Sequence, residues 1–385
     1  MSPTTFQPSS KLPAIGVSIF SVMTKLANEH GAINLSQGFP DFGCDPALVE
    51  AVAKAMRDGH NQYPPMPGVQ ALRDAIAGKV AHCYGATVDP QSEVLVTSGA
   101  TEALYSTLTA FVQPGDEVVL FEPCYDSYVP AILLSGGTPV FVSLRYPDYQ
   151  VDWDEVARAI TPKTKAILVN TPHNPTGMTW TPEDMRRLAA LVDGSGILLI
   201  GDEVYEHIIF DGRRHESLLR YPDLRSRAVV ISSFGKTFHT TGWKVGYAVA
   251  PAPILAEVQR VHQFVTFTVH SASQIAFAEF VTRDPGAAAL PAFYQAKRDR
   301  FLRLLEGSRF APLACNGTYF QLMDYSAITS DRDTDVATWL IKEHGVAAIP
   351  CSAFNYKDAG GPVLRFCFAK KDETLEAAAG RLQKA

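Results

Sequence analysis

Lys236 stands in a sequence setting that suits covalent chemistry. It follows the apolar run 228–231 and the hydroxyls of Ser232 and Ser233, and a second cation, Lys244, comes eight residues later. A lysine amine at the end of a buried strand can form a Schiff base with an aldehyde, and a nearby hydroxyl and positive charge suit a phosphate on the same molecule. These residues predict that Lys236 binds pyridoxal phosphate. A lysine taken alone is most often a solvated surface charge, so the prediction depends on further groups.

The elements that would position those groups follow from the hydrophobic pattern. Apolar runs at 93–97, 117–121, 165–170 and 196–201 have strand length, and apolar residues recur between them at helical spacing, as at Leu104, Leu108 and Phe111. Continuous apolar strands that alternate with helices predict an α/β fold with a mostly parallel sheet covered on both faces. In such sheets the loops that follow the strands converge on a ligand site.

Polar and aromatic side chains follow each of these strands. The first strand runs into a helix near Ala100 and Thr101, where free backbone N–H groups favour a phosphate. Tyr125 follows the second strand, Asn174 lies between two prolines after the third, and Asp202 follows the fourth. Each has an ordinary alternative, in turn a strand-to-helix turn, a packing aromatic, a turn asparagine and a helix N-cap. Their occurrence at successive strand ends favours a shared site.

Composition restricts the remaining function classes. The chain has 385 residues, of which 46% are hydrophobic and 19% charged, as is typical of a globular protein long enough for two domains. A net charge of −6 gives no basic face for a nucleic acid. Six cysteines are scattered without C-x-x-C or zinc-type spacing, so we expect neither a metal nor disulfides. The sequence has no apolar stretch of membrane-span length and does not start with a secretory signal pattern, so we expect a cytoplasmic protein without membrane contact.

A set of motifs carries a resemblance to a known family. They are 174–177 (Asn-Pro-Thr-Gly), 202–205 (Asp-Glu-Val-Tyr), and 233–236 (Ser-Phe-Gly-Lys) with 242–246 (Gly-Trp-Lys-Val-Gly). From about Lys11 to its end, the chain resembles the class I/II pyridoxal-phosphate-dependent aminotransferases of fold type I. The stretches 33–42, 61–63, 68–73 and 344–350 are similar to those of the methionine aminotransferase and kynurenine aminotransferase/glutamine transaminase K group within it.

The resemblance implies a domain organisation and a homodimer. A large domain at residues 41–280 would contain a mostly parallel, seven-stranded sheet between helices, and residues 1–40 with 281–385 would form a smaller α+β domain. Turn signals at 283–286 mark the break, and Asp372 opens a final helix. Tyr63 corresponds to a family tyrosine that reaches the phosphate in the neighbouring subunit. Packing before the Pro-rich turn at 64–67 is an equally good reading of Tyr63.

The resemblance also implies roles in cofactor binding. Lys236 would form the internal aldimine with pyridoxal 5'-phosphate, and Asp202 would pair with the protonated ring nitrogen. Tyr205 and Asn174 would hydrogen-bond to the phenolic oxygen, and Tyr125 would stack on the ring. The groups for the phosphate would be the backbone N–H of Ala100 and Thr101, the hydroxyl of Ser233 and the charge of Lys244. The aspartate-type pattern has an arginine in place of Lys244, so here the phosphate would be held by charge without a bidentate fork.

Arg365 and Gly38 are the candidates for contact with the substrate carboxylate. Arg365 interrupts an apolar strand at 362–368, so it is either an edge-strand charge or a carboxylate clamp, and the resemblance favours the clamp. Gly38 would let the backbone approach the same carboxylate. The aromatic candidates for the substrate rim are Phe20, Phe39, Tyr125, Phe264, Phe267 and Tyr319, and Asn174 would also contact the substrate. An apolar rim favours methionine, phenylalanine, tyrosine, glutamine or kynurenine over aspartate, whose second carboxylate would need another cation.

The implied activity is transfer of the amino group of an apolar or aromatic L-amino acid to a 2-oxo acid. Lys236, once freed by the substrate, would move the α-proton, which requires a neutral amine, and a desolvated site near other cations favours that form. Two alternatives use the same scaffold: a β-lyase acting on cysteine S-conjugates, and a catalytically silent pyridoxal-phosphate-binding or regulatory protein. A silent protein would be expected to lack Lys236, Asp202 or Arg365, and all three are present.

Overall fold

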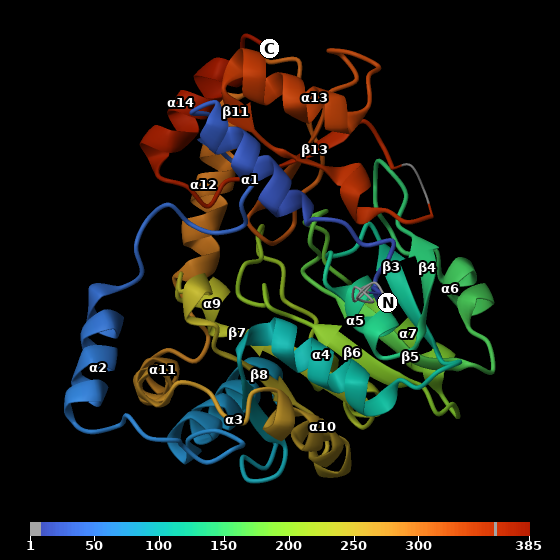
Figure 1. Ribbon diagram of the computed structural model, residues 1–385, viewed down its shortest axis with the longest axis vertical. Helices are drawn as coiled ribbons and strands as arrows, with labels where there is room; N and C mark the ends of the chain where they lie inside the picture. The colour runs from blue at the N-terminus through green and yellow to red at the C-terminus, as the bar shows by residue number, and fades with distance from the viewer. Residues whose placement is uncertain (1–8, 358–359) are drawn as a thin grey trace, which may run out of the picture.

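A seven-stranded sheet forms the centre of the molecule (Figure 1). The computed structural model describes residues 9–357 and 360–385. In pairing order the strands are β2 (Val94–Thr97), β8 (Gly246–Val249), β7 (Ala228–Ser233), β6 (Leu198–Asp202), β5 (Thr164–Asn170), β3 (Glu117–Glu122) and β4 (Thr138–Ser143). Neighbouring strands are parallel, except that β8 runs antiparallel to both β2 and β7. The prediction of a mostly parallel sheet is confirmed.

Helices cover both faces of this sheet. Successive strand residues point to opposite faces and are apolar, so both faces must be buried. In β3, for example, Leu120 packs into one core and Val119 into the other. One face is covered by α4 (Gly99–Phe111), α5 (Tyr128–Leu134) and α10 (Ala252–Val265). The other core takes in α2 (Pro46–Arg57), α3 (Gln70–Tyr84), α6 (Trp153–Ala159), α7 (Pro182–Val192), α8 (Pro222–Arg225), α9 (Phe234–Thr237) and α11 (Ser271–Arg283).

Two strands of the sheet were not predicted from the sequence. β4 contains Pro139 and lies at the edge of the sheet. An edge strand pairs on one side only, so it can accommodate a proline, which lacks a backbone N–H. β8 is only four residues long and begins at Gly246, the last residue of the motif at 242–246, so no turn signal separates the strand from that motif. The other five strands lie where the apolar runs predicted them.

A second group of elements has its own core and lies at the top of Figure 1, in orange and red with α1 in blue. Its helices are α1 (Ile19–Glu29), α12 (Leu290–Leu304), α13 (Asp333–Trp339) and α14 (Asp372–Leu382). An antiparallel sheet has the order β12 (Ile349–Pro350), β13 (Val363–Cys367), β10 (Phe320–Asp324) and β9 (Ala311–Pro312), and β1 (Ile33–Asn34) pairs in parallel with β11 (Val346–Ala347).

Short helical turns occur in both parts of the molecule. They are η1 (Leu218–Arg220), η2 (Thr241–Trp243), η3 (Leu340–His344) and η4 (Cys351–Phe354). The domain limits at 41–280, and at 1–40 with 281–385, stay a prediction.

Local sequence signals set the ends of several helices. Asp45 accepts a hydrogen bond from the Ala47 N–H and is followed by proline at the first helical position of α2, and Thr181 forms a capping box with Asp184 at the start of α7. α14 begins at Asp372, as predicted. All six cysteines are free thiols. Within the described ranges, no helix combines the length and apolar character needed to cross a bilayer.

Candidate active site

A cavity of about 300 Å³ opens at the carboxyl ends of β5, β6 and β7, where a ligand site is expected in a parallel sheet. Its walls come from these strand ends, from the start of α4 and from elements of the second group. Most of the predicted site residues line it: Phe20, Gly38, Ala100, Thr101, Tyr125, Asn174, Asp202, Tyr205, Ser233, Lys236, Lys244 and Arg365. The fold therefore brings these predicted residues, which are distant along the chain, into one cavity.

One end of the cavity carries the free N–H groups of α4 next to a cation. Gly99 has a φ of +73°, and a Cβ at this position would lie 3.2 Å from the Lys244 side chain. A Cβ at Gly246 would lie 2.8 Å from the backbone of Gly99. Glycine at both positions therefore lets the helix start and the Lys244 loop approach closely. The Ala100 and Thr101 N–H groups, the helix dipole and the ammonium together form a donor set that suits a phosphate.

Lys236 is held in α9, which begins where β7 ends. The hydroxyl of Ser233 caps this short helix by accepting from the Gly235 N–H at 3.1 Å. The Lys236 amine donates to the Tyr319 hydroxyl at 2.8 Å and to the Gly38 carbonyl at 3.1 Å. Burial lowers the pKa of Lys236 to about 8. The neutral form that a nucleophile or base requires is therefore much more populated near neutral pH than in a free lysine, whose pKa is about 10.4.

Asp202 lies at the end of β6 and receives a hydrogen bond that the sequence did not predict. The Tyr128 hydroxyl donates to its Oδ2 at 2.6 Å. Burial raises the pKa of Asp202 to about 6, and the hydrogen bond from Tyr128 opposes that rise. The sequence pointed to Tyr125 after β3 but not to Tyr128. The direction of the Tyr128 hydroxyl depends on the start of α5, which the sequence analysis did not locate.

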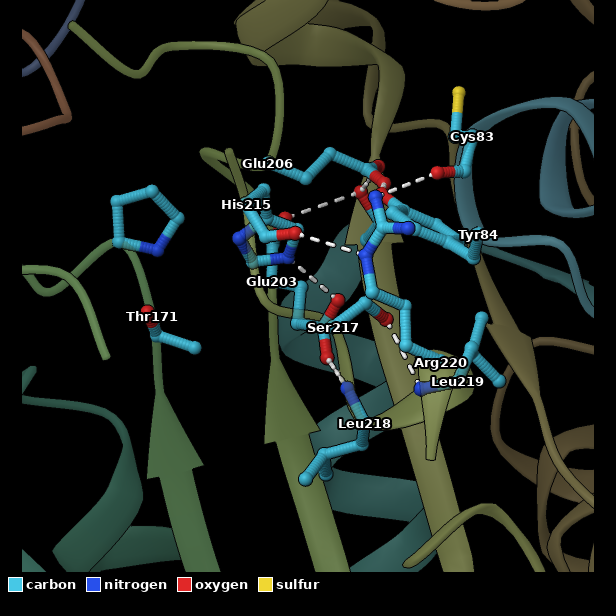
Figure 2. Close-up of polar contacts among 12 residues, drawn as sticks. Cys83, Tyr84, Thr171, Glu203, Glu206, His215, Ser217, Leu218, Leu219 and Arg220 are labelled. Carbon is cyan, nitrogen blue, oxygen red and sulfur yellow. Dashed lines mark hydrogen bonds and ion pairs between the residues drawn. The ribbon is translucent and has the colours of Figure 1, made fainter. Parts of the chain in front are cut away.

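The segment from Asp202 to Glu206 points its side chains in two directions. Asp202 and Tyr205 line the cavity, whereas Glu203 and Glu206 do not. Glu203 accepts from His215 Nε2 at 2.8 Å and from the Leu218 N–H at 3.0 Å. Figure 2 shows these buried contacts at the end of the strand.

Glu206 is held more extensively. It pairs with Lys79 at 2.5 Å, accepts from Tyr247 at 2.9 Å, and also accepts from Tyr84 and Ser232. Burial alone would raise the pKa of Glu206, but the charge of Lys79 overcomes it and holds that pKa well below its usual range. Two buried carboxylates thus fix the backbone that presents Asp202 and Tyr205.

Arg365 lies in β13, which pairs with β10 on one side and β12 on the other. It is therefore not an edge-strand charge. Its side chain is 1% exposed, Nη1 donates to Asn174 Oδ1 at 2.6 Å, and Nη2 donates to the Ser36 carbonyl at 3.1 Å. Across residues 9–357 and 360–385 its buried Nε has no hydrogen-bond partner. A buried guanidinium that bonds only neutral groups calls for an anion.

Tyr63 and Phe267 do not line the cavity of the single chain. Tyr63 is 82% exposed and Phe267 46%, and their rings pack edge to face with 5.5 Å between centroids. Phe264 nearby is 86% exposed. The predicted roles of Tyr63 in a neighbouring subunit and of Phe267 at the substrate rim stay predictions. Tyr319, a further rim candidate, is fully buried and contacts Lys236.

Comparison with known proteins agrees with this arrangement. A family model described as aminotransferase class I and II matches residues 30–382. The chain is 51% identical over 378 residues to methionine aminotransferase of Escherichia coli strain K12, and the match covers 98% of both chains. It is 34% identical to a kynurenine–oxoglutarate transaminase of Dictyostelium discoideum, over 99% of this chain and 97% of the relative. A solved Escherichia coli structure with an identified methionine aminotransferase function aligns with a TM-score of 0.97 at 50% identity, over 99% of this chain and all (100%) of the other.

Proposed function

We propose, from the premise that this chain belongs to the aminotransferase class I and II family, that it moves the amino group of an apolar or aromatic L-amino acid to a 2-oxo acid. It is a pyridoxal-phosphate-dependent aminotransferase. The relatives named for methionine and kynurenine support the choice of amino donor. The observation that carries the proposal is the buried guanidinium of Arg365, which has no acidic partner among the described residues and lies in the same cavity as the Lys236 amine.

The cavity offers a fitting group for each part of pyridoxal phosphate. We assign the phosphate to the donors at one end of the cavity, which are Ala100, Thr101, Ser233 and Lys244. Asp202 takes the protonated ring nitrogen, and the hydrogen bond from Tyr128 keeps its carboxylate ionised. Asn174 uses its amide oxygen for Arg365, which leaves its NH₂ group for the ring oxygen alongside Tyr205. Tyr125 covers the ring. When bound, the cofactor supplies an electron sink for negative charge at the substrate α-carbon.

The chain's own residues then act on the substrate. Arg365 binds the α-carboxylate through its Nε, which has no partner within the described residues. Glycine at position 38 lets the Phe320 ring pack closely, because a Cβ there would lie 2.9 Å from that ring, and we assign the Gly38 backbone to the same carboxylate. Lys236 Nζ, whose pKa is lowered to about 8 by burial, acts in its neutral form: it removes the α-proton and later gives that proton back. Arg365 thus orients the α-carbon toward Lys236.

The walls favour an apolar side chain. Phe20, Tyr125 and Phe320 line the part of the cavity near Arg365. The cations in the lining are Lys236, Lys244 and Arg365, and each already has a role. Among the described residues of the lining, no further cation awaits a second carboxylate, so aspartate should be a poor donor.

We also propose a homodimer. Tyr63 and Phe267 are exposed and pack against each other, and Phe264, three residues before Phe267, is also exposed. Exposed aromatic side chains of this kind are typical of a surface that a second subunit covers. Sedimentation should give a dimer, and Phe264→Glu should shift it toward monomer. A wild-type monomer with full activity would contradict the role of Tyr63 in a neighbouring site. Location in the cytoplasm stays a prediction from the sequence.

The decisive experiment combines covalent mapping with a donor panel. Borohydride reduction of the loaded protein and peptide mass mapping should find the cofactor on Lys236. Single additions of methionine, phenylalanine, kynurenine, glutamine and aspartate, followed by the visible absorbance of the cofactor, should rank aspartate last. A label on another residue would overturn the proposal, and a preference for aspartate would overturn the choice of substrate.

A further inference from the structure

The free amine of Lys236 has two oxygen acceptors on the side of the cavity formed by the second group of elements. Nζ donates to the Tyr319 hydroxyl at 2.8 Å and to the Gly38 carbonyl at 3.1 Å. It also lies 5.3 Å from the ring centres of Tyr205 and Tyr319. Under the proposed function, the amine must leave the cofactor during each transfer. The contacts of the released amine therefore affect how quickly it can move the α-proton and bond to the cofactor again.

Tyr319 is well fixed for this contact. Its side chain is fully buried, and its ring packs against Tyr205 and Phe320 with centroids 5.2 and 5.0 Å away. Its backbone carbonyl accepts from the Phe368 N–H at 3.0 Å. The hydroxyl donates its own proton to the Gly38 carbonyl. Its oxygen lone pairs are therefore left to face Nζ.

We propose that Tyr319 is a positioning residue that, with the Gly38 carbonyl, forms a holding site for the Lys236 amine whenever that amine is not bonded to the cofactor. The inference rests on the proposed function, because a holding site matters only if Lys236 leaves and rejoins the cofactor. The three atoms form a closed set: Nζ donates to both oxygens, and the phenol donates to the carbonyl. Burial raises the pKa of Tyr319 well above its usual value, so the phenol stays neutral and acts as an acceptor.

The holding site should stabilise the ammonium form of Lys236. Removing the Tyr319 hydroxyl leaves the buried ammonium with the Gly38 carbonyl alone, so the amine should lose its proton at a lower pH. Among the described residues, the charged and titratable groups that act on the Lys236 amine include Asp202, Lys244, Arg365 and Cys367, and the Tyr205 ring lies beside it. All of them are retained in a Tyr319→Phe variant. A difference between the variant and the wild type therefore reports on the hydroxyl.

Tyr294 provides a matched control. It is fully buried, its ring centroid lies 5.6 Å from that of Tyr319, and its hydroxyl has no hydrogen-bond partner in the described part of the chain. Tyr294→Phe thus removes the same atom from the same aromatic cluster without touching Lys236.

The test is the pH profile of Lys236 acetylation by acetic anhydride in the cofactor-free protein, read by peptide mass spectrometry. In Tyr319→Phe the midpoint should fall by about one pH unit, the size expected for one hydrogen bond to a charged group. In Tyr294→Phe it should match the wild type. An unchanged or higher midpoint in Tyr319→Phe, or an equal fall in both variants, would overturn the holding site.

Two further measurements keep the test decisive. Borohydride mapping of the wild type separates the two proposals: a label away from Lys236 removes the proposed function, whereas a label on Lys236 with an unmoved midpoint removes only the holding site. If Tyr319→Phe does not fold, 3-fluorotyrosine at position 319 keeps the ring and hydroxyl but weakens the oxygen as an acceptor. A smaller fall in the midpoint then supports the holding site, and no fall refutes it.

Discussion

Arg365→Lys should weaken the binding of carboxylates to this protein while leaving neutral ligands of the same shape unaffected. In the structure, Nη1 and Nη2 are engaged by Asn174 and the Ser36 carbonyl, and the buried Nε has no partner in the described ranges. A lysine keeps the charge but cannot bond Asn174 and a carboxylate from the two sides of a planar fork. The variant should therefore lose about one charge-assisted hydrogen bond.

The magnitude follows from that single bond. A hydrogen bond to a charged group contributes about 1.5–3 kcal/mol, and about 1.4 kcal/mol corresponds to a tenfold change in affinity. The dissociation constant of hydrocinnamate should rise roughly 10- to 100-fold in Arg365→Lys. That of the corresponding alcohol, which has the same ring and chain without the carboxylate, should change by less than about twofold.

Calorimetric titration of the loaded enzyme with both ligands measures this difference directly. Arg298→Lys is the control, because Arg298 is also largely buried but is paired with Asp211 and does not line the cavity. It should leave both affinities unchanged. Equal losses for the acid and the alcohol in Arg365→Lys would show that Arg365 supports the shape of the site and not the carboxylate.

Three further outcomes are expected. Tyr128→Phe should weaken cofactor binding to the apoenzyme about tenfold, as measured by equilibrium dialysis. The loss should be larger at lower pH, because without this hydrogen bond the pKa of Asp202 rises above about 6. An unchanged affinity across the pH range would contradict this. The rate of cofactor uptake by the apoenzyme should rise with pH and level off above about 8, since only the neutral Lys236 amine attacks; a midpoint near that of a free lysine would exclude a depressed pKa. Lys79→Met should lower the free energy of unfolding in urea by about 3–5 kcal/mol by leaving Glu206 buried and unpaired, and adding Glu206→Gln should restore much of it. A loss below about 1 kcal/mol in the single variant would indicate that the pair is dispensable.

The sequence predicted those features that depend on one strand and the loop after it. Asp202 and Lys236 each end an apolar run, so a parallel sheet brings them to one edge whatever the rest of the chain does. Contacts between distant segments were not accessible in this way. The hydroxyls of Tyr128 and Tyr319 reach Asp202 and Lys236 only because α5 and β10 pack as they do.

The same limit applies to strands and to the environment of Arg365. β8 was missed because it is short and begins inside the motif at 242–246, and because its pairing with β2 joins residues that are far apart in the sequence. The two readings of Arg365 differed in whether β13 has neighbours on both sides. The neighbours of β13 are residues 320–324 and 349–350, and nothing in their local sequence indicates that they pair with 363–367.

The segment from Asp202 to Glu206 also indicates where this enzyme will tolerate redesign. Asp202 and Tyr205, which line the cavity, are each followed directly by a carboxylate, Glu203 or Glu206, that belongs to a buried hydrogen-bonded cluster. A change to the backbone at either position will therefore usually disturb that cluster. Phe20 belongs to a different element, α1, and is held by ring contacts with Tyr125 and Phe354. In a directed-evolution library aimed at new amino donors, position 20 should accept replacements that position 205 rejects.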